Sequence, residues 1–373
     1  MIDSRRLLDT FLTILRIDSY HPNEDPVIDA LRPRLEGAGV RLHADPHRNV
    51  LGFWPGAGSR AGEEPVLLCA HTDTVRPTTG MEPVIRDGTV HTDGSSVLGA
   101  DDKSAVAAIV EAVEAIAASG APHPPVEVLF TVGEDVGHVG SKAFDVAPVR
   151  SRMAFVPDID GPVGGIVMAS PWTDTLRVSF HGRAAHAGTE PEEGRSALQM
   201  AARAIQRMQL GRIDGDTIAN AGVLTGGEAK NIIPPEASLT LEVRSLDQSR
   251  FVEHRDALLE CCQQGAAAFG GTVDVESLDA MTGYRFGLND APVRYAEAAI
   301  RAAGLDPWRT TTCGVSDANE FNAKGLPTAV ISVGYVDIHT DQESMPIDEL
   351  NRLAEVCRAL MLGGRPAACR GAS

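Results

Sequence analysis

Short, uninterrupted runs of hydrophobic residues alternate with helical patterns over residues 65–172. The runs at 65–70, 126–132 and 153–156 are typical of strands that are buried on both faces of a parallel sheet. Between the first two runs, hydrophobic residues recur at helical spacing over 104–119. Because alternating strands and helices favour a sheet covered by helices on both faces, we predict a three-layer α/β domain.

The pattern changes over residues 173–285, where the predicted order β-α-β-β-α-β is that of a ferredoxin-like α+β unit. The α/β pattern then resumes. We therefore predict a small domain, 173–285, inserted into a larger discontinuous domain made of 1–172 and 286–373. The predicted elements from residue 173 onward are strands at 175–180, 218–224, 237–243, 272–277 and 328–333 and helices at 191–208, 250–268, 291–303 and 347–361.

The composition disfavours several classes of protein. With 33 Lys and Arg against 51 Asp and Glu, the formal net charge is −18, so we expect no nucleic-acid partner. No hydrophobic run approaches the ~18 residues that cross a membrane. The N-terminal hydrophobic residues share one helical face, unlike the core of a signal peptide. The six cysteines form no C-x-x-C pair, which is typical of cytoplasmic thiols, and we expect a cytoplasmic protein.

Histidines and carboxylates follow the predicted strands at the points where they end. In an open α/β sheet, ligands bind beyond the carboxyl ends of the strands, so these side chains are expected at one edge. Each residue alone has a simpler interpretation as a solvated loop residue or a helix cap. Their coincidence on separate segments is unusual, and imidazole with carboxylate suits zinc, cobalt or manganese. The residues are His71 and Asp73, Asp101, Glu134 and Asp135, Asp158, and His339.

Other catalytic signatures are absent from the sequence. It contains no G-x-x-x-x-G-K-[ST], no H-E-x-x-H and no G-x-S-x-G motif. A nucleotide enzyme or a serine hydrolase is therefore disfavoured.

Taken together, the motifs resemble those of the co-catalytic dizinc peptidases. That family includes peptidase T, glutamate carboxypeptidases, aminoacylases and succinyl-diaminopimelate desuccinylase. The resemblance covers nearly the whole chain and is strongest to the peptidase T-like branch. The motifs are His71-Thr-Asp73-Thr-Val, Leu98-Gly-Ala-Asp101-Asp-Lys, Phe130-Thr-Val-Gly-Glu134-Asp135-Val-Gly, Asp158-Ile-Asp-Gly-Pro-Val-Gly, Ala185-His186-Ala-Gly, Gly314-Val-Ser-Asp-Ala-Asn and Ile338-His339-Thr-x-x-Glu343.

The resemblance implies two divalent metal ions, most simply zinc, with cobalt or manganese as alternatives. It assigns His71 and Asp158 to one ion, Asp135 and His339 to the other, and Asp101 to both as the bridging ligand. It also implies a cis peptide bond after the bridging aspartate. Many relatives have Glu where this chain has Asp135, and a side chain shorter by one methylene is expected to shift or weaken the second metal.

Two further carboxylates receive catalytic roles. Asp73 lies two residues after His71, so on an extended strand both side chains project to the same side, and Asp73 is placed to accept the second N–H of the imidazole. Glu134 precedes Asp135 and points the other way in extended backbone. The resemblance makes Glu134 the general base for a metal-bridging hydroxide, because it can take a proton from water and pass it to the leaving amine.

The inserted domain contributes further candidates through the resemblance alone. His186 corresponds to an oxyanion-stabilising histidine, Asn231 to a substrate-contacting amide and Arg244 to an arginine that grips a substrate carboxylate. Gly314 corresponds to a close approach of backbone to substrate, although the following Val315 departs from a glycine-rich pattern. Without the resemblance, these residues have the simpler interpretation of ordinary loop and strand-end positions.

The prediction is a metal-dependent hydrolase of amide bonds in short peptides, most simply a tripeptide aminopeptidase. The same site serves an N-acyl amino acid amidohydrolase or a carboxypeptidase, and these remain alternatives. A catalytically silent metal- or peptide-binding relative is the non-enzyme alternative, against which the retention of Glu134 and Asp73 argues. The resemblance also implies a homodimer formed through the inserted lid or dimerisation domain, in which His186 serves the partner's site.

Overall fold

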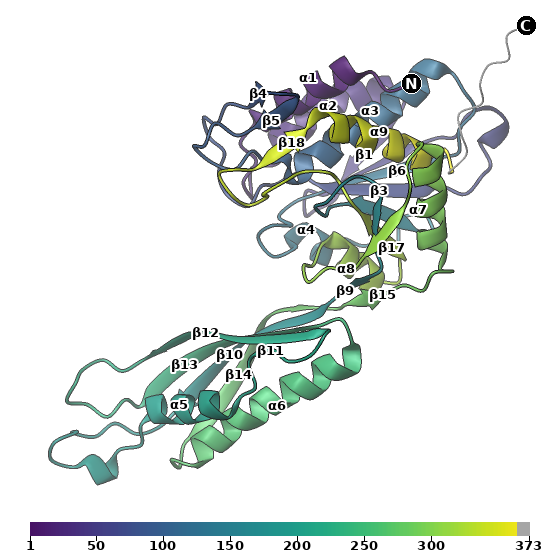
Figure 1. Cartoon of the computed structure of the whole chain (residues 1–373). Coiled ribbons are helices and arrows are strands. Elements are labelled where there is room, and N and C mark those ends of the chain that lie inside the picture. The colour runs from purple at the N-terminus through teal and green to yellow at the C-terminus, as the bar shows by residue number, and fades with distance from the viewer. Residues whose placement is uncertain (364–373) are drawn as a thin grey trace, which may run out of the picture. The chain divides into compact units, whose positions relative to one another are not determined.

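The computed structural model describes residues 1–363, which form two compact units (Figure 1). Unit 1 comprises Met1–Met168, Phe286–Thr311 and the residues from Ser316 onward, whereas unit 2 comprises Ala169–Arg285 and Thr312–Val315. Unit 2 thus begins before residue 173 and also includes a short segment that the sequence pattern places in the larger domain. Cys369 lies outside the described residues, and the other cysteines are free.

Unit 1 is built on an eight-stranded mixed sheet with the order β1-β2-β6-β3-β7-β17-β8-β16. The central strands β6, β3, β7 and β17 run parallel, so their carboxyl ends meet at one edge. The strands are β1 (Arg41–Ala44), β2 (Val50–Trp54), β3 (Val66–His71), β6 (Val126–Thr131), β7 (Ala154–Pro157), β8 (Gly165–Val167), β16 (Trp308–Thr310) and β17 (Thr328–Ile331).

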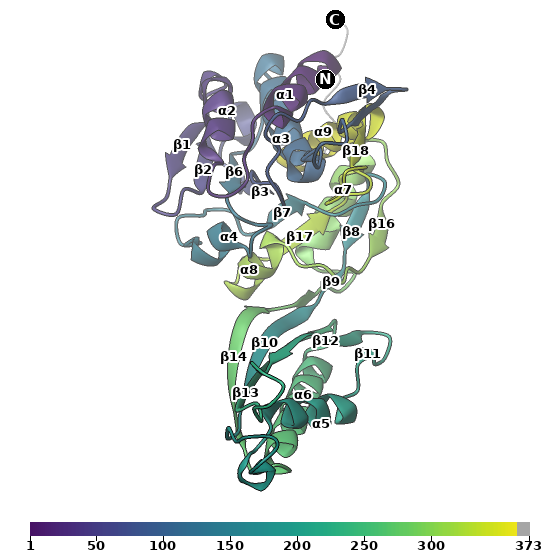
Figure 2. The same ribbon diagram turned by 90° about the vertical axis from the view of Figure 1, so that its left-hand side faces the viewer.

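Helices cover both faces of this sheet. Figures 1 and 2 show α1, α2, α3 and α9 on one face and α4 and α8 on the other, which makes the three layers of an α/β fold. The helices of unit 1 are α1 (Ser4–Leu15), α2 (Asp25–Gly37), α3 (Ala100–Ser119), α4 (Val139–Ala143), α7 (Ala291–Ala302), α8 (Asp317–Ala323) and α9 (Ile347–Met361).

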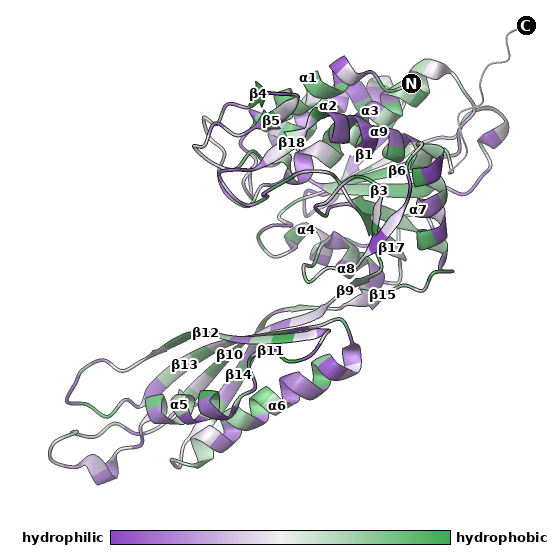
Figure 3. Cartoon of the chain, in the orientation of Figure 1, coloured by the Kyte–Doolittle hydropathy of each residue, from purple (hydrophilic) through white to green (hydrophobic). Residues whose placement is uncertain are grey.

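The helix α3 lies in the centre of the core, and nearly all of its residues are buried. A helix that is apolar on all sides is stable only when other elements surround it, and here α1 and α9 pack against it. Figure 3 shows the same apolar character in β3 and β6, as the continuous hydrophobic runs predict. The regular helix starts after Asp102, because Asp101 has an extended ψ of 107°.

A small antiparallel sheet closes one side of unit 1. Its strands are β4 (Val84–Arg86), β5 (Thr89–His91) and β18 (Ser344–Pro346), in the order β18-β5-β4. The strand β18 directly follows Glu343, and Ser344 also pairs with Val336. The loop that contains His339 is therefore fixed at both ends.

Unit 2 is an α+β unit with a five-stranded antiparallel sheet in the order β11-β12-β13-β10-β14. Two helices pack on it, and both contribute to a separate hydrophobic core. The elements are β9 (Ala169–Ser170), β10 (Trp172–His181), α5 (Ala197–Arg207), β11 (Gly211–Arg212), β12 (Thr217–Gly226), β13 (Glu236–Ser245), α6 (Gln248–Ala267), β14 (Thr272–Met281) and β15 (Tyr284–Arg285).

The helix predicted over 191–208 begins at Ala197 in the structure. Pro191–Glu193 forms a separate turn of 3-10 helix, and the side chain of Ser196 caps α5 by accepting from the backbone N–H of Gln199. No helix within residues 1–363 is both long and apolar enough to cross a membrane.

Candidate metal centre

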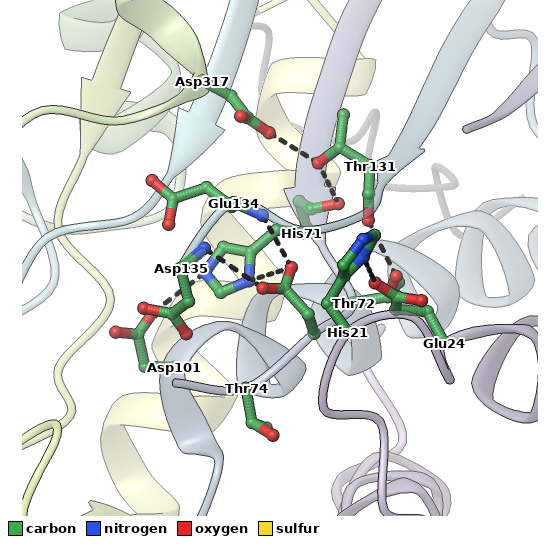
Figure 4. Close-up of polar contacts among 12 residues, drawn as sticks. His21, Glu24, His71, Thr72, Thr74, Asp101, Thr131, Glu134, Asp135 and Asp317 are labelled. Carbon is green, nitrogen blue, oxygen red and sulfur yellow. Dashed lines mark hydrogen bonds and ion pairs between the residues drawn. The ribbon is translucent and has the colours of Figure 1, made fainter. Parts of the chain in front are cut away.

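The carboxyl ends of the central strands bring the predicted ligands of unit 1 together. His71 is the last residue of β3, Asp158 directly follows β7, and Asp135 lies in the turn after β6. Asp101 opens α3, and His339 lies between β17 and β18. Figure 4 shows the side chains of His71, Asp101 and Asp135 close together at this edge.

The carboxylate of Asp101 lies between two imidazoles. Its Oδ1 is 3.2 Å from His71 Nε2, and its Oδ2 is 3.1 Å from His339 Nε2. His339 Nε2 is also 3.1 Å from Asp135 Oδ1. One carboxylate that presents a separate oxygen to each of two imidazole groups has the arrangement expected of a bridging metal ligand. The Asp101–Asp102 peptide bond is cis.

Asp102 joins this cluster although the sequence analysis gives it no role. Ligand atoms of His71, Asp102 and Asp158 lie within 4.8 Å of one another, as do those of Asp101, Asp135 and His339. Asp102 is fully buried, and neither of its carboxylate oxygens has a hydrogen-bond partner among the described residues. Asp135 Oδ2 is likewise buried without a partner there. Buried carboxylate oxygens left unpaired fit a bound cation, so the donor set suits a metal.

The electrostatics of the cluster reflect carboxylates that are buried close together. Burial, and then the charge of Asp158, raise the pKa of Asp102 well above its usual value. Burial opposes ionisation of Asp101 as well, but the hydrogen bonds from His339 and His71 outweigh it and lower its pKa. Hydrogen bonds to Asp101 and Asp135 raise the pKa of His339 to about 10. A divalent cation would supply the positive charge that these carboxylates lack.

Asp73 orients both a ligand and the neighbouring turn. Its Oδ1 lies 3.4 Å from His71 Nδ1, the nitrogen that faces away from Asp101. The same carboxylate accepts the backbone N–H groups of Glu134 at 2.9 Å and Asp135 at 3.1 Å. Asp73 therefore does more than the sequence analysis predicts, because it also holds the turn after β6.

Glu134 is buried beside the ligands, as Figure 4 shows. Burial raises its pKa to about 6, against the opposing effect of the nearby His138 imidazole. A carboxylate whose pKa lies near neutrality is suited to accept and return a proton.

Two further buried side chains support the centre, and the sequence analysis gives neither a role. Glu343 accepts the backbone N–H groups of Gly99 at 2.9 Å and Asp101 at 3.0 Å. The hydroxyl of Tyr335 donates to Asp158 Oδ1 at 3.2 Å. The spacing His339-Thr-x-x-Glu343 is the only signal in the sequence that points to Glu343.

In unit 2, the loops that carry His186 and Asn231 lie side by side. The backbone N–H of Ala187 donates to the Asn231 carbonyl at 2.9 Å. His186 and Ile232 form an isolated antiparallel β-bridge. His186 Nδ1 accepts the N–H groups of Gly188 and Thr189 at 3.1 and 3.2 Å. With Nδ1 as the acceptor, Nε2 is the ring nitrogen left to donate, on an exposed side chain.

Arg244 and Gly314 also lie in one neighbourhood of unit 2. Arg244 Nη1 donates to the carbonyl of Cys313 at 2.9 Å, next to Gly314. Its Nε and Nη2 donate to Glu242 Oε1 at 3.1 and 2.6 Å, so the guanidinium is paired within its own sheet. A Cβ at Gly314 would meet only the Thr312 hydroxyl, at 3.3 Å, so the need for glycine there comes from the resemblance alone.

Comparison with known proteins decides the family. The family model "Peptidase family M20/M25/M40" matches residues 67–363. The chain belongs to this peptidase family. It is therefore a metallopeptidase that hydrolyses amide bonds.

Similarity to individual proteins extends over nearly the whole chain. The crystal structure of aminopeptidase PepT from Bacillus cereus is 34% identical, with a TM-score of 0.91 over 97% of this chain and 99% of that one. A tripeptidase from Staphylococcus aureus is 32% identical, with a TM-score of 0.90 over 97% and 98%. An uncharacterised protein of Bacillus subtilis, YqjE, is 35% identical over 97% of this chain and 99% of its own length. The peptidase T-like branch predicted from the sequence is confirmed.

Proposed function

We propose that this chain is a tripeptide aminopeptidase, which removes the N-terminal residue of a tripeptide. The proposal is carried by the similarity to an aminopeptidase and a tripeptidase, which are 34% and 32% identical over 97% of the chain. That similarity spans both units, so it covers the segments to which we assign hydrolysis and substrate selection.

Two divalent cations are proposed, zinc most simply, with cobalt or manganese as alternatives. His71 and Asp158 would hold one, Asp135 and His339 would hold the other, and Asp101 would be a ligand shared by both, with Asp102 as a further donor beside the first. When bound, the cations act as Lewis acids that polarise the scissile carbonyl and lower the pKa of water. Imidazole and carboxylate ligands without thiolate suit all three metals.

The chain's own groups move and hold the protons. Glu134 accepts a proton from the attacking water and delivers it to the leaving amine. Asp73 keeps the Nδ1 proton of His71 in place and leaves Nε2 free as a ligand. His186 donates from Nε2 to the oxyanion that develops on the scissile carbonyl.

Substrate selection is assigned to unit 2. Arg244 binds the terminal carboxylate of a short peptide. To do so, its guanidinium gives up its ion pair with Glu242 and forms one with the substrate. Asn231 supplies an amide to the peptide backbone, and the backbone at Gly314 lines the same end.

Turnover of a small panel tests this function. The purified protein with zinc, cobalt or manganese is given a tripeptide, the same tripeptide with an acetylated amino terminus, the same tripeptide with an amidated carboxyl terminus, a dipeptide and an N-acetyl amino acid. We expect hydrolysis of the free tripeptide with release of its N-terminal residue. Hydrolysis of the acetylated substrates instead favours an amidohydrolase, and release of the C-terminal residue favours a carboxypeptidase.

A homodimer formed through unit 2 and a cytoplasmic location are also proposed. β12 pairs with β11 only at Ile218 and Ala219, and within the described residues its remaining length pairs on one side only. Val223 and Leu224 on that stretch are 53% and 41% exposed. An unpaired edge with exposed apolar side chains favours contact with a second copy. Free cysteines suit a reducing compartment.

Mixing two inactive variants tests whether His186 acts across that interface. Chains with Glu134→Gln are combined with chains with His186→Ala and allowed to exchange subunits. If the histidine serves the partner's site, a mixed dimer has one site with both defects and one with neither, so activity returns. Absence of activity despite proven exchange would rule out the arrangement but not the metal centre.

A further inference from the structure

A second cluster of buried titratable side chains adjoins the metal centre in unit 1. It consists of Glu134, His138 and Asp317, whose ligand atoms lie within 4.8 Å of one another. Their exposed fractions are 8%, 5% and 1%. His138 and Asp317 are not among the ligands of the metal centre, and the mechanism above uses neither of them.

The turn after β6 places His138 against Glu134. The carbonyl of Glu134 accepts the backbone N–H groups of Gly137 at 3.1 Å and His138 at 2.8 Å, which brings His138, four positions later, back onto Glu134. His138 Nδ1 then lies 3.2 Å from Glu134 Oε1. His138 has a φ of 57°, in the left-handed region that suits glycine or asparagine better. A positive φ is uncommon for a residue other than glycine, although histidine is one of those that tolerate it, so the substitutions at this position must also accept that conformation.

Asp317 lies near the same ring nitrogen of His138 that faces Glu134. It lies in the first turn of α8, and its Oδ2 accepts the hydroxyl of Thr131 at 2.5 Å, as Figure 4 shows. Its Oδ1 is 3.8 Å from His138 Nδ1. Because Thr131 ends the strand that precedes Glu134, Asp317 is fixed to the same strand end as the general base. Asp317, His138 and Glu134 form a chain of contacts that leads to the base.

The charges of the cluster favour a protonated imidazole. Burial alone lowers the pKa of His138, but its close contacts with Asp317 and Glu134 and their charges outweigh burial and raise the pKa to about 10. Both carboxylates lie nearest Nδ1, at 3.2 Å for Glu134 and 3.8 Å for Asp317, so an imidazolium attracts both through ion pairs rather than through well-aligned hydrogen bonds. This ion pair favours the orientation of Glu134 in which its Oε1 faces His138.

We propose that His138, anchored by Asp317, is a positioning residue that fixes the carboxylate of Glu134 for proton transfer. The inference rests on the proposed role of Glu134 as general base. It does not require a tripeptide substrate, because orientation of the base matters for any amide that the site hydrolyses.

Two substitutions separate the imidazole contact from the backbone strain. Asparagine and glycine both accept a φ near 57°, but only asparagine can place an N–H near the position of Nδ1. We expect His138→Gly to lower kcat roughly 10- to 100-fold, and His138→Asn to recover most of that loss. KM and metal content are expected to stay within about twofold, because no ligand or substrate contact changes. His123→Asn is the control, since His123 is also 5% exposed but stacks on Trp54 away from the ligands.

A double substitution tells positioning from a general structural role. If His138 acts through Glu134, then His138→Gly causes little further loss of kcat in a Glu134→Gln background. Equal losses in both backgrounds, an unchanged kcat in the single variant, or a parallel loss of metal would each overturn the proposal. The assay uses any peptide of the panel that the parent enzyme hydrolyses. A different substrate preference would therefore revise the proposed function. The comparison of His138→Gly in the two backgrounds would still test the positioning role of His138.

Discussion

Replacing Glu343 by glutamine tests whether a side chain that touches no metal determines how tightly metal binds. The carboxylate of Glu343 is 1% exposed and uses one oxygen for the N–H of Gly99 and the other for the N–H of Asp101. Glutamine has the same shape but only one acceptor oxygen. In Glu343→Gln, one of the two buried N–H groups therefore faces an NH2 group.

The expected cost follows from these two contacts. Burial raises the pKa of Glu343 to about 7, so its carboxylate is charged above that pH. There, a hydrogen bond to a charged acceptor contributes about 1.5–3 kcal/mol, and a buried N–H left without an acceptor costs about 1–3 kcal/mol. We expect the substitution to destabilise the metal-free protein by about 2–4 kcal/mol. Because Asp101 is the proposed bridging ligand, the looser turn is also expected to weaken metal binding by about 10- to 100-fold.

Glu127→Gln is the matched control. Glu127 is also 1% exposed and accepts the backbone N–H groups of Arg150 at 3.0 Å and Ser151 at 2.8 Å. It lies at the amino end of β6, whereas the metal centre lies at the carboxyl end. Both variants are expected to lose similar unfolding free energy in denaturant titrations, but only Glu343→Gln should lose affinity in a competition with a metal chelator. Equal metal affinity in the two variants would refute the proposed link between the Asp101 turn and the metal.

Three further outcomes are expected. Glu134→Gln should lower kcat at least ~10²-fold while the metal is retained, and a nearly fully active Glu134→Gln would contradict the mechanism. Asp135→Ala should instead lower the metal content of the protein. Metal at 100 times its Kd should stabilise the native state by about 2.7 kcal/mol, so identical melting curves with chelator and with zinc, cobalt or manganese would count against the centre. In the metal-free protein, the raised pKa of His138, about 10, means that its stabilisation is complete below about pH 6.5 and is lost as pH rises toward 10. Between pH 7 and 9, the free energy of unfolding should therefore decrease more steeply with pH in the parent protein than in His138→Asn. The expected difference between the two slopes is up to about 1.4 kcal/mol per pH unit, and equal slopes would refute a charged imidazole.

The parts of the fold that the sequence predicts are those in which burial leaves an uninterrupted pattern. β3, β6 and β7 are buried along their whole length, so each appears as a continuous hydrophobic run. Because these strands are parallel neighbours, the residues that follow them meet at one edge, and the prediction of a shared site followed from strand ends alone.

Elements at the margin of the sheet were harder to predict. β1 is largely exposed, with no hydrophobic run to mark it, and α2 has Pro33 in its interior, which weakens a helical pattern. The predicted start of unit 2, residue 173, lies after its observed start at Ala169 for a related reason. β9 pairs with β15 across a long stretch of sequence, and such pairing has no local signal.

The missed residues of the site are those whose role depends on a distant partner. Asp317 meets the hydroxyl of Thr131 across 186 positions of the chain, and Glu343 meets the N–H of Asp101 across 242. No spacing within a motif encodes such contacts. Asp102 was missed for a different reason, because an aspartate at the start of a helix has the simpler interpretation of a cap.

The buried carboxylates of unit 1 fall into two groups: those that accept hydrogen bonds from backbone N–H groups and those that do not. The two groups are expected to respond differently to substitution. Asp73 and Glu343 accept backbone N–H groups, so they hold the turns that carry the ligands. Asp102 has no such partner among the described residues, and its charge is opposed by burial and by Asp158. Removing a carboxylate of the first kind leaves N–H groups unsatisfied, whereas removing Asp102 relieves repulsion in the metal-free protein. Asp102→Asn should therefore raise the melting temperature of the metal-free protein and lower the additional stabilisation by metal, and a fall in both would show that Asp102 has a structural role instead.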